Sequence, residues 1–279
     1  MKQQATLWAA FAFAGVLATG ASAAPFVLED LNSRLSGDTA GGGVTEWRVN
    51  GVNHLFQEWF WIRVDGTSLG DREHRLSSFD ILAQQTTDTN TFTDPRHDNL
   101  NVVYNIDGLL RAEVSLSLRG SQCCGSDLAE QVSIVNTSGG ALSFSFFEYT
   151  DFDLGGTSFD TFADFTPTAT GGAFRQDDDT GIWRSTTVVT PRPSFWEIAY
   201  YATTLGKLDD DMPTTLSNTV SPLLNGDLTW AAQWNVTLND GQTWLLSKDK
   251  LLTPIPLPAP AFLLLGGLAA LGALKRRAA

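Results

Sequence analysis

Alternation of apolar and polar residues runs through the middle of this 279-residue chain. From 228 to 238, one face collects Leu, Trp, Ala, Trp, Val and Leu, while the other collects Thr, Ala, Gln, Asn and Thr. Residues 112–118 and 142–146 alternate in the same way. A period of two puts every second side chain on one face, so these segments predict half-buried β-strands. Residues 56–64 are apolar on both faces and predict a central strand.

Turn signals separate the alternating segments. Asn50-Gly51, Asp107-Gly108 and Asp240-Gly241 suit two-residue turns with positive φ. The last pair predicts a hairpin between 228–238 and 243–250. Polar residues 86–98 and 206–225 predict long loops, and no internal repeat is visible. The expected fold is all-β, a large antiparallel two-sheet β-sandwich of roughly a dozen strands.

Composition narrows the class of protein. Hydrophobic residues make up 43% of the chain and aromatic residues 11%, which is enough for a packed core. There are 18 Lys and Arg against 31 Asp and Glu, a net charge of −13. Affinity for phosphate is built from clustered Lys and Arg, so this balance argues against nucleic acid as a partner.

The first 23 residues are typical of a secretory signal peptide. Lys2 precedes an apolar run at 7–17, and the small residues Ala21 and Ala23 precede a cleavage position after Ala23, which leaves Ala24 as the mature start. We therefore expect a signal helix at 1–23 and export through the inner membrane of a Gram-negative bacterium.

The C-terminal end has three parts. A proline-rich segment, 255–260, precedes fourteen apolar residues at 261–274 and then Lys275, Arg276 and Arg277. A helix of that length spans about 21 Å, less than the ~30 Å hydrocarbon core, so we expect a short transmembrane helix that anchors only transiently. The three cations act as a stop-transfer signal and stay in the cytoplasm.

This end resembles the PEP-CTERM class of bacterial sorting signals, in the variant that reads Val-Pro-Leu-Pro-Ala. The matching residues are Ile255, Pro256, Leu257, Pro258 and Ala259, with Ile255 in place of Val. The resemblance covers 254–279 and implies recognition by exosortase, a membrane-embedded cysteine protease, in cells that make exopolysaccharide or biofilm. An ordinary tail anchor is the alternative. Either way, 24–253 is expected to form the β-sandwich domain.

Acidic residues suggest an ion site. Asp151 and Asp153 share one face of an extended segment, and Asp160 and Asp164 follow. Calcium takes six to eight oxygen ligands, so such residues could hold Ca²⁺ loosely. The segment is no EF-hand, because Phe162 stands at the twelfth position in place of Glu. Solvated loop carboxylates are the alternative, and no other cofactor is required.

The only two cysteines, Cys123 and Cys124, are adjacent. In an exported protein they could form a vicinal disulfide, pair between molecules or stay reduced. Gly66-Thr67-Ser68-Leu69-Gly70 matches a nucleophile elbow, but that motif needs a strand-to-helix turn of a parallel sheet, so we interpret it as an ordinary turn. His54, His74 and His97 show no metal-binding spacing.

Tryptophans are abundant, and some could stack on sugar rings. The alternation places Trp230 and Trp234 in the core. Trp59 and Trp61 share the face opposite Phe60, and at least one of these two faces is expected to be core. Trp183 and Trp196 flank a proline bend and are expected to be exposed. A glycosidase would need two carboxylates about 5–10 Å apart. The strand-borne candidates, among which the sequence does not choose, are Glu58, Glu113, Glu148 and Glu197.

The leading interpretation is a non-enzymatic, exosortase-sorted β-sandwich protein of the cell surface or the exopolysaccharide matrix, structural or glycan-associated. It would be held briefly in the inner membrane and then released or attached outside the cell. The alternatives are a carbohydrate-active enzyme acting on the extracellular polysaccharide and a calcium-dependent glycan-binding module.

Overall fold

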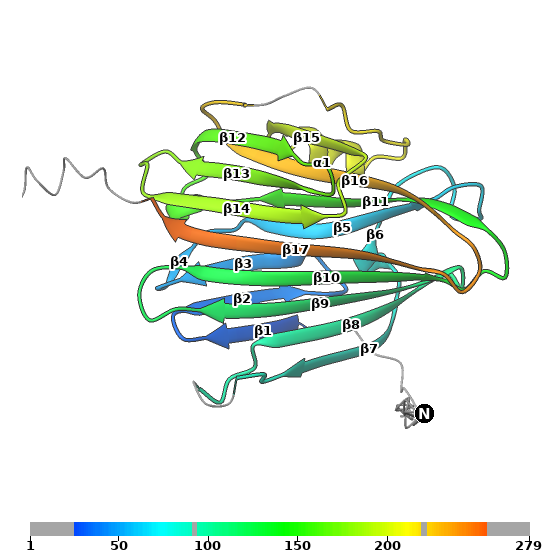
Figure 1. Cartoon of the computed structure of the whole chain (residues 1–279), viewed down its shortest axis with the longest axis horizontal. Coiled ribbons are helices and arrows are strands. Elements are labelled where there is room, and N and C mark those ends of the chain that lie inside the picture. Colours follow the sequence, from blue (N-terminus) through cyan, green and yellow to red (C-terminus); the bar gives the residue numbers. More distant parts are fainter. Residues whose placement is uncertain (1–24, 91–93, 219–221, 256–279) are drawn as a thin grey trace, which may run out of the picture.

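The computed structural model describes residues 25–90, 94–218 and 222–255. Two antiparallel sheets face each other, and Figure 1 looks onto the eight-stranded one. Its strands, in spatial order, are β12 (Asp160–Pro167), β13 (Gly172–Asp178), β14 (Trp183–Thr190), β17 (Thr243–Pro254), β10 (Ser126–Asn136), β9 (Leu110–Gly120), β8 (Asn99–Ile106) and β7 (Asp80–Thr87).

The nine-stranded sheet lies behind it. Its strands, in spatial order, are β1 (Pro25–Asp30), β2 (Ser33–Asp38), β3 (Gly43–Val49), β5 (Gln57–Val64), β11 (Leu142–Asp151), β16 (Leu228–Leu238) and β15 (Phe195–Tyr200), with β4 (Val52–Asn53) paired to β3 and β6 (His74–Arg75) paired to β5. The helical segments are α1 (Thr203–Leu208), η1 (Leu76–Ser78) and η2 (Leu154–Gly156). The expected two-sheet β-sandwich is therefore confirmed, with more strands than the dozen predicted.

Both predicted terminal helices lie outside the described residues, as do the signal cleavage position and the sorting motif after Ile255. Ile255 itself directly follows β17, and its N–H donates to the Ile182 carbonyl at 2.6 Å. Within the described ranges, no helix is both long and apolar enough to span a membrane.

Two of the three predicted hairpin turns are confirmed. Asn50 and Gly51 have φ of 51° and 84° and join β3 to β4, with Val49 opposite Val52. Asp107 and Gly108 have φ of 52° and 71° and lie between the paired strands β8 and β9. Positive φ at consecutive residues is the geometry that Asn-Gly and Asp-Gly favour.

The third predicted hairpin is wrong. The chain turns at Asp240 and Gly241 as expected, but β16 belongs to the nine-stranded sheet and β17 to the eight-stranded one. β16 already has β11 and β15 at its two edges, and β17 has β10 and β14. The turn therefore crosses from one sheet to the other, because turn residues reverse the chain without selecting a strand partner.

The two predicted loops hold in part. The first is predicted at 86–98, but β7 extends to Thr87, and β8 begins at Asn99. The start of the second loop overlaps α1, a short helix at Thr203–Leu208 that the sequence pattern does not predict. The predicted central strand is confirmed: β5 lies between β3 and β11, and most of its residues are buried on both faces.

The core between the sheets is rich in aromatic rings. Trp47, Trp230 and Trp234 are buried there, whereas Trp59 and Trp61 are buried on the other face of β5, where Trp61 Nε1 donates to Asp209 Oδ1 at 2.9 Å. The Phe174 ring of β13 stacks on the Trp230 ring of β16 with centroids 4.2 Å apart, and this contact joins the two sheets. Burial of such large rings is the main source of stability in a sandwich of this kind.

Candidate functional site

Three of the four acidic residues proposed as ion ligands come together at one end of the sandwich. Asp151 ends β11, Asp153 follows it, and Asp160 begins β12. They meet Asp227, the residue before β16, which the sequence analysis did not single out. We call Asp151, Asp153, Asp160 and Asp227 the acidic cluster.

Backbone hydrogen bonds fix Asp160 beside Asp227. The Asp160 N–H donates to the Gly226 carbonyl at 2.7 Å, and the Leu228 N–H donates to Asp160 Oδ2 at 3.0 Å. These two bonds bracket Asp227. Since Asp227 lies between the predicted loop at 206–225 and the predicted strand at 228–238, pattern alone could not have selected it.

A buried glutamine joins the two halves of the cluster. Gln176 on β13 donates through Nε2 to the Phe152 carbonyl at 3.3 Å and to the Leu228 carbonyl at 3.0 Å. Phe152 lies between Asp151 and Asp153, and Leu228 follows Asp227. The glutamine thus holds the end of β11 against the start of β16.

Asp164 lies apart from the other three predicted residues. β12 has a bulge between Asp160 and Phe162, which shifts its alternation. Asp160, Ala163 and Phe165 are buried as a result, and Asp164 points to the opposite face from Ala163 and Phe165. Simple period-two counting would have put Asp160 and Asp164 on one face.

The negative charge of the acidic cluster is poorly compensated by nearby cations. Burial raises the pKa of Asp151 and that of Asp160 to about 8, and the charges of neighbouring members add to the rise. Burial likewise raises the pKa of Asp153 and of Asp227. Among the described residues, none of the four makes an ion pair with Lys or Arg.

Exposed aromatic side chains surround the acidic cluster. Phe56 is 48% exposed and Tyr201 is 44% exposed, and their rings meet edge to face at 5.7 Å. The Phe56 N–H donates to the Asp151 carbonyl and the Tyr201 N–H to the Asp227 carbonyl, both at 2.9 Å. Phe159, next to Asp160 in the chain, is exposed as well. Aromatic surface and carboxylates therefore occupy the same end of the sandwich.

The tryptophans do not form this aromatic surface. Trp183 and Trp196, expected to be exposed, are only half-exposed: Trp183 packs on His54 with ring centroids 4.3 Å apart, and Trp196 on Phe165 at 4.7 Å. Both rings complete the edge of the core. The exposed rings belong instead to Phe and Tyr near strand ends, where hydrophobic periodicity carries no signal.

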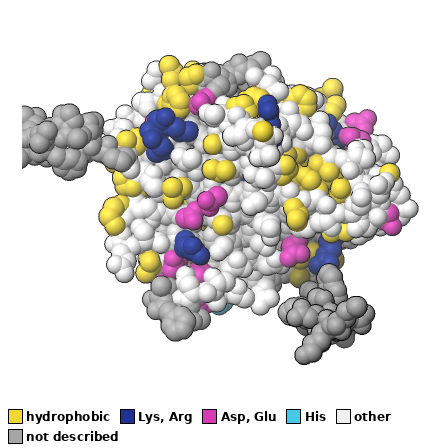
Figure 2. All heavy atoms as spheres, viewed as in Figure 1, with side chains coloured by type: hydrophobic (Ala, Val, Ile, Leu, Met, Phe, Trp, Pro, Cys, Tyr) yellow, Lys and Arg dark blue, Asp and Glu magenta, His cyan; other side chains and the backbone are white. Residues whose placement is uncertain are grey.

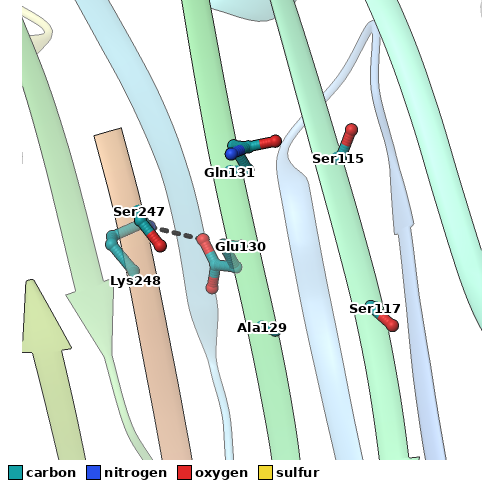
Figure 3. A pocket seen from close by; sticks show the side chains of 7 residues that line it. All are labelled: Ser115, Ser117, Ala129, Glu130, Gln131, Ser247 and Lys248. Atoms are coloured by element: carbon teal, nitrogen blue, oxygen red, sulfur yellow. Dashed lines mark hydrogen bonds and ion pairs between the residues drawn. The ribbon is translucent and has the colours of Figure 1, made fainter. Parts of the chain in front are cut away.

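A shallow groove crosses the outer face of the eight-stranded sheet. Figure 3 shows Ser115 and Ser117 of β9, Gln131 of β10 and Ser247 of β17 lining a hollow of about 160 Å³. A second hollow of about 310 Å³ shares Ser115 and Gln131 and includes Leu245. Figure 2 shows the same face, on which charged side chains are few and hydrophobic ones form scattered patches.

Behind this groove lies a group of charged residues between the sheets. We call it the inter-sheet charge cluster; its members are Glu58, Glu130, Glu148, Lys248 and Lys250. All five are buried. Burial and the charge of Glu130 raise the pKa of Glu58 to about 8. With a proton on Glu58, two carboxylates balance two ammonium groups.

The inter-sheet charge cluster is a structural element. Its three glutamates have oxygens within 4.8 Å of one another, close enough to hold a metal. Lys248 and Lys250 already ion-pair with all three of them, so the cationic position is filled. Two of the glycosidase candidates, Glu58 and Glu148, are therefore buried in this cluster and are not accessible to a substrate.

The other two glycosidase candidates lie on different sheets. Glu113 of β9 lines the outer groove and accepts a hydrogen bond from Asn101 Nδ2 at 2.7 Å. Glu197 of β15 is buried, and Lys207 Nζ donates to it at 2.7 Å. The four predicted glutamates thus do not supply a pair that faces one shared cavity.

The remaining sequence features take ordinary structural roles. Cys123 and Cys124 are joined as a vicinal disulfide in the turn between β9 and β10, where Asn50 Nδ2 donates to the Cys123 carbonyl at 2.9 Å. Ser68 lies in the loop between β5 and β6, away from any helix, and its hydroxyl donates to Asp107 Oδ2 at 3.1 Å. His74 is not the hydrogen-bond partner of Ser68, because its Nε2 lies 2.9 Å from the Leu69 carbonyl oxygen.

The fold and this site define an antiparallel β-sandwich with an acidic and aromatic end. No model of a known protein family matches the sequence, and no curated protein matches it either. Among solved structures, the chain is similar to a bacterial glucoamylase complexed with acarbose, with a TM-score of 0.54 and 9% identity. The match covers 81% of this chain and 31% of the glucoamylase, so this chain corresponds to only part of that protein.

Two more distant similarities are to complete chains. A galactose mutarotase-like protein from Lactobacillus casei has a TM-score of 0.47 and 8% identity, covering 82% of this chain and 100% of its own. The Slr1438 protein from Synechocystis has a TM-score of 0.49 and 14% identity, covering 87% and 100%. At 9% identity, the comparison with the glucoamylase establishes a shared fold and no more.

Proposed function

We propose that this is an exported, exosortase-sorted protein of the cell surface or the exopolysaccharide matrix, and that it binds a glycan strand at the acidic and aromatic end of its sandwich. The signal peptide and the C-terminal sorting motif support the routing. The aromatic pair Phe56 and Tyr201 beside the acidic cluster supports glycan binding, and this juxtaposition carries the proposal.

The chemistry of the aromatic pair suits a sugar. The two rings offer apolar surface on which the C–H face of a pyranose ring can pack, and carboxylate and carbonyl oxygens beside them can accept hydrogen bonds from hydroxyl groups. The fold shared with part of a bacterial glucoamylase is in keeping with this, although a shared fold does not define a ligand.

Binding to the exopolysaccharide secreted by the producing cells tests the proposal. In affinity electrophoresis, the wild-type protein is expected to be retarded by this polysaccharide, and the double variant Phe56→Ala with Tyr201→Ala is expected to lose most of the retardation. Both side chains are about half exposed, so the variant should remain folded, which a melting curve would verify.

A matched control examines the outer groove. Leu245→Ala removes a 55% exposed apolar side chain from the groove on the outer face of the eight-stranded sheet. This change should leave the retardation unchanged. Loss of binding in this variant but not in the double variant would place the glycan in the groove and overturn the proposed site. Shortening of the polysaccharide during the assay would overturn the binding role in favour of a carbohydrate-active enzyme.

A further inference from the structure

A buried carboxyl group and a buried amide group lie beside each other at the acidic end of the sandwich, and each has an oxygen without a donor. Asp160 of β12 and Gln176 of β13 are both 0% exposed, and their side chains interact. Gln176 donates through Nε2 to the carbonyls of Phe152 and Leu228, but its Oε1 atom has no partner. Asp160 Oδ1 has none either, while Oδ2 accepts from the Leu228 N–H. Two acceptors are thus buried together without a hydrogen between them.

A proton on Asp160 would satisfy both atoms. A carboxylic acid has one O–H donor, and the carbonyl oxygen of a glutamine is an acceptor. Protonated Oδ1 would donate to Gln176 Oε1, and Oδ2 would keep its hydrogen bond from Leu228. One shared cation fits less well, because among the described residues only the glutamates of the inter-sheet charge cluster bring their oxygens within 4.8 Å of one another.

The titratable groups around Asp160 offer it no positive charge. They are Tyr149 and Asp151 of β11, Asp153 after that strand, Asp178 of β13 and Asp227 before β16. Asp178 accepts from backbone N–H groups of its own turn. On β15, Glu197 is paired with Lys207, and the Tyr200 hydroxyl donates to a backbone carbonyl. Burial and the neighbouring carboxylates accordingly raise the pKa of Asp160 to about 8.

We propose that Asp160 is protonated in the folded protein at neutral pH and donates to Gln176, and that this hydrogen bond, the proton latch, closes the acidic end of the sandwich until the pH rises. Gln176 belongs to the eight-stranded sheet and binds Phe152 and Leu228, which adjoin or begin strands of the nine-stranded sheet. Release of the proton to water would set a negative charge against the amide oxygen and beside the other carboxylates. The connection between the sheets would weaken as a result.

The proton latch also bears on glycan binding, and this part of the inference rests on the proposed function. The Asp151 carbonyl accepts from the Phe56 N–H, and the Asp227 carbonyl accepts from the Tyr201 N–H. The two exposed rings are therefore attached to the two segments that carry these carboxylates. Repulsion between the segments at alkaline pH would separate the rings and weaken the retention of a glycan.

The variant Asp160→Asn tests the latch, because its amide can donate to Gln176 and accept from Leu228 at every pH. The pKa of the wild-type group is raised from an ordinary 3.8 to about 8, so its stabilising effect is complete below about pH 3.8 and lost as the pH passes through about 8. In urea denaturation, the folding equilibrium constant of the wild type relative to the variant should fall up to about tenfold per pH unit between these values. Asp164→Asn, on the same strand but the opposite face, keeps Asp160 and should decline with pH like the wild type.

Infrared spectroscopy detects the proton directly. At about pH 6, the C=O band of a protonated carboxylic acid should be weaker in Asp160→Asn than in the wild type and in Asp164→Asn. Parallel denaturation curves, or equal infrared bands, for the wild type and Asp160→Asn would overturn the proton latch.

Affinity electrophoresis with the exopolysaccharide tests the control of glycan binding. Between about pH 6 and about pH 9, the wild type should lose most of its retardation, whereas Asp160→Asn should keep it. Equal retardation of the wild type at both pH values would overturn this control. Absence of retardation at every pH would contradict the glycan proposal alone, since the denaturation and infrared measurements decide the latch without any glycan.

Discussion

Lys248 Nζ of β17 lies 2.5 Å from Glu148 Oε1 of β11, so an ion pair crosses from one sheet to the other through the centre of the core. The Lys248 ammonium group also sits over the Phe60 ring, 4.5 Å from its centroid. A buried pair of this kind adds little net stability over apolar side chains, but breaking it is costly because it leaves an uncompensated charge.

Replacement of Lys248 by Met should therefore destabilise the fold strongly. The change leaves Glu130 and Glu148 buried with one cation fewer, and we expect a loss of about 3–5 kcal/mol in the free energy of unfolding, measured by urea denaturation. Lys207→Met is the matched control: this lysine is 42% exposed, and Glu197 keeps Thr204 and Ser217 as donors, so the loss should stay near 1 kcal/mol. Equal losses in the two variants would contradict the assignment of Lys248 to a closed core cluster.

Glu58 should make stability fall as the pH rises. Its pKa is raised from an ordinary 4.5 to about 8 by burial and by Glu130, so the folded state binds a proton that the unfolded state has released between these values. This contribution is complete below about pH 4.5 and is lost as the pH passes through about 8, with a slope of up to about 1.4 kcal/mol per pH unit.

The variant Glu58→Gln isolates this contribution, because it keeps the side-chain shape and cannot ionise. Urea denaturation of both proteins from about pH 5 to about pH 8 should show a steeper decline for the wild type. Titrating groups outside the inter-sheet charge cluster are common to both proteins and cancel in the difference. Parallel curves would mean that Glu58 is not the protonated member of the inter-sheet charge cluster.

The C-terminal signal gives a prediction about processing. Replacing 256–260 by a flexible polar linker removes the proline motif but keeps the apolar segment and the terminal cations. We expect the altered protein to stay in the inner membrane with its tail intact, as shown by fractionation and mass spectrometry. If the extracellular form still lacks 261–279 after this change, recognition does not depend on the proline motif and the sorting proposal fails. Cells without exosortase serve as the reference for unprocessed protein.

Local pattern was enough to predict that this chain forms an antiparallel sandwich. The alternation in β9, the two-sided apolar segment of β5 and the Asn-Gly and Asp-Gly turns each depend on residues close together in sequence, and each is seen in the structure. β16 is a strand as predicted, but its residues 228–234 are buried on both faces and not on one. Three of the four acidic residues chosen from their spacing also meet at one end.

The strand pairing and the membership of the two clusters depend on contacts between residues that are far apart in the sequence. Whether β17 pairs with β16 or crosses to the other sheet depends on which strand edges are already occupied, and a single bulge in β12 separates Asp164 from Asp160. Asp227 joins the acidic cluster only because Gln176 and Asp160 hold its segment in place. Glu58 resembles any strand carboxylate in the sequence, and only the packing of two sheets makes it a buried partner of Lys250. A period-two pattern specifies the face on which a side chain lies, whereas its partner across the core is set by the arrangement of the whole chain.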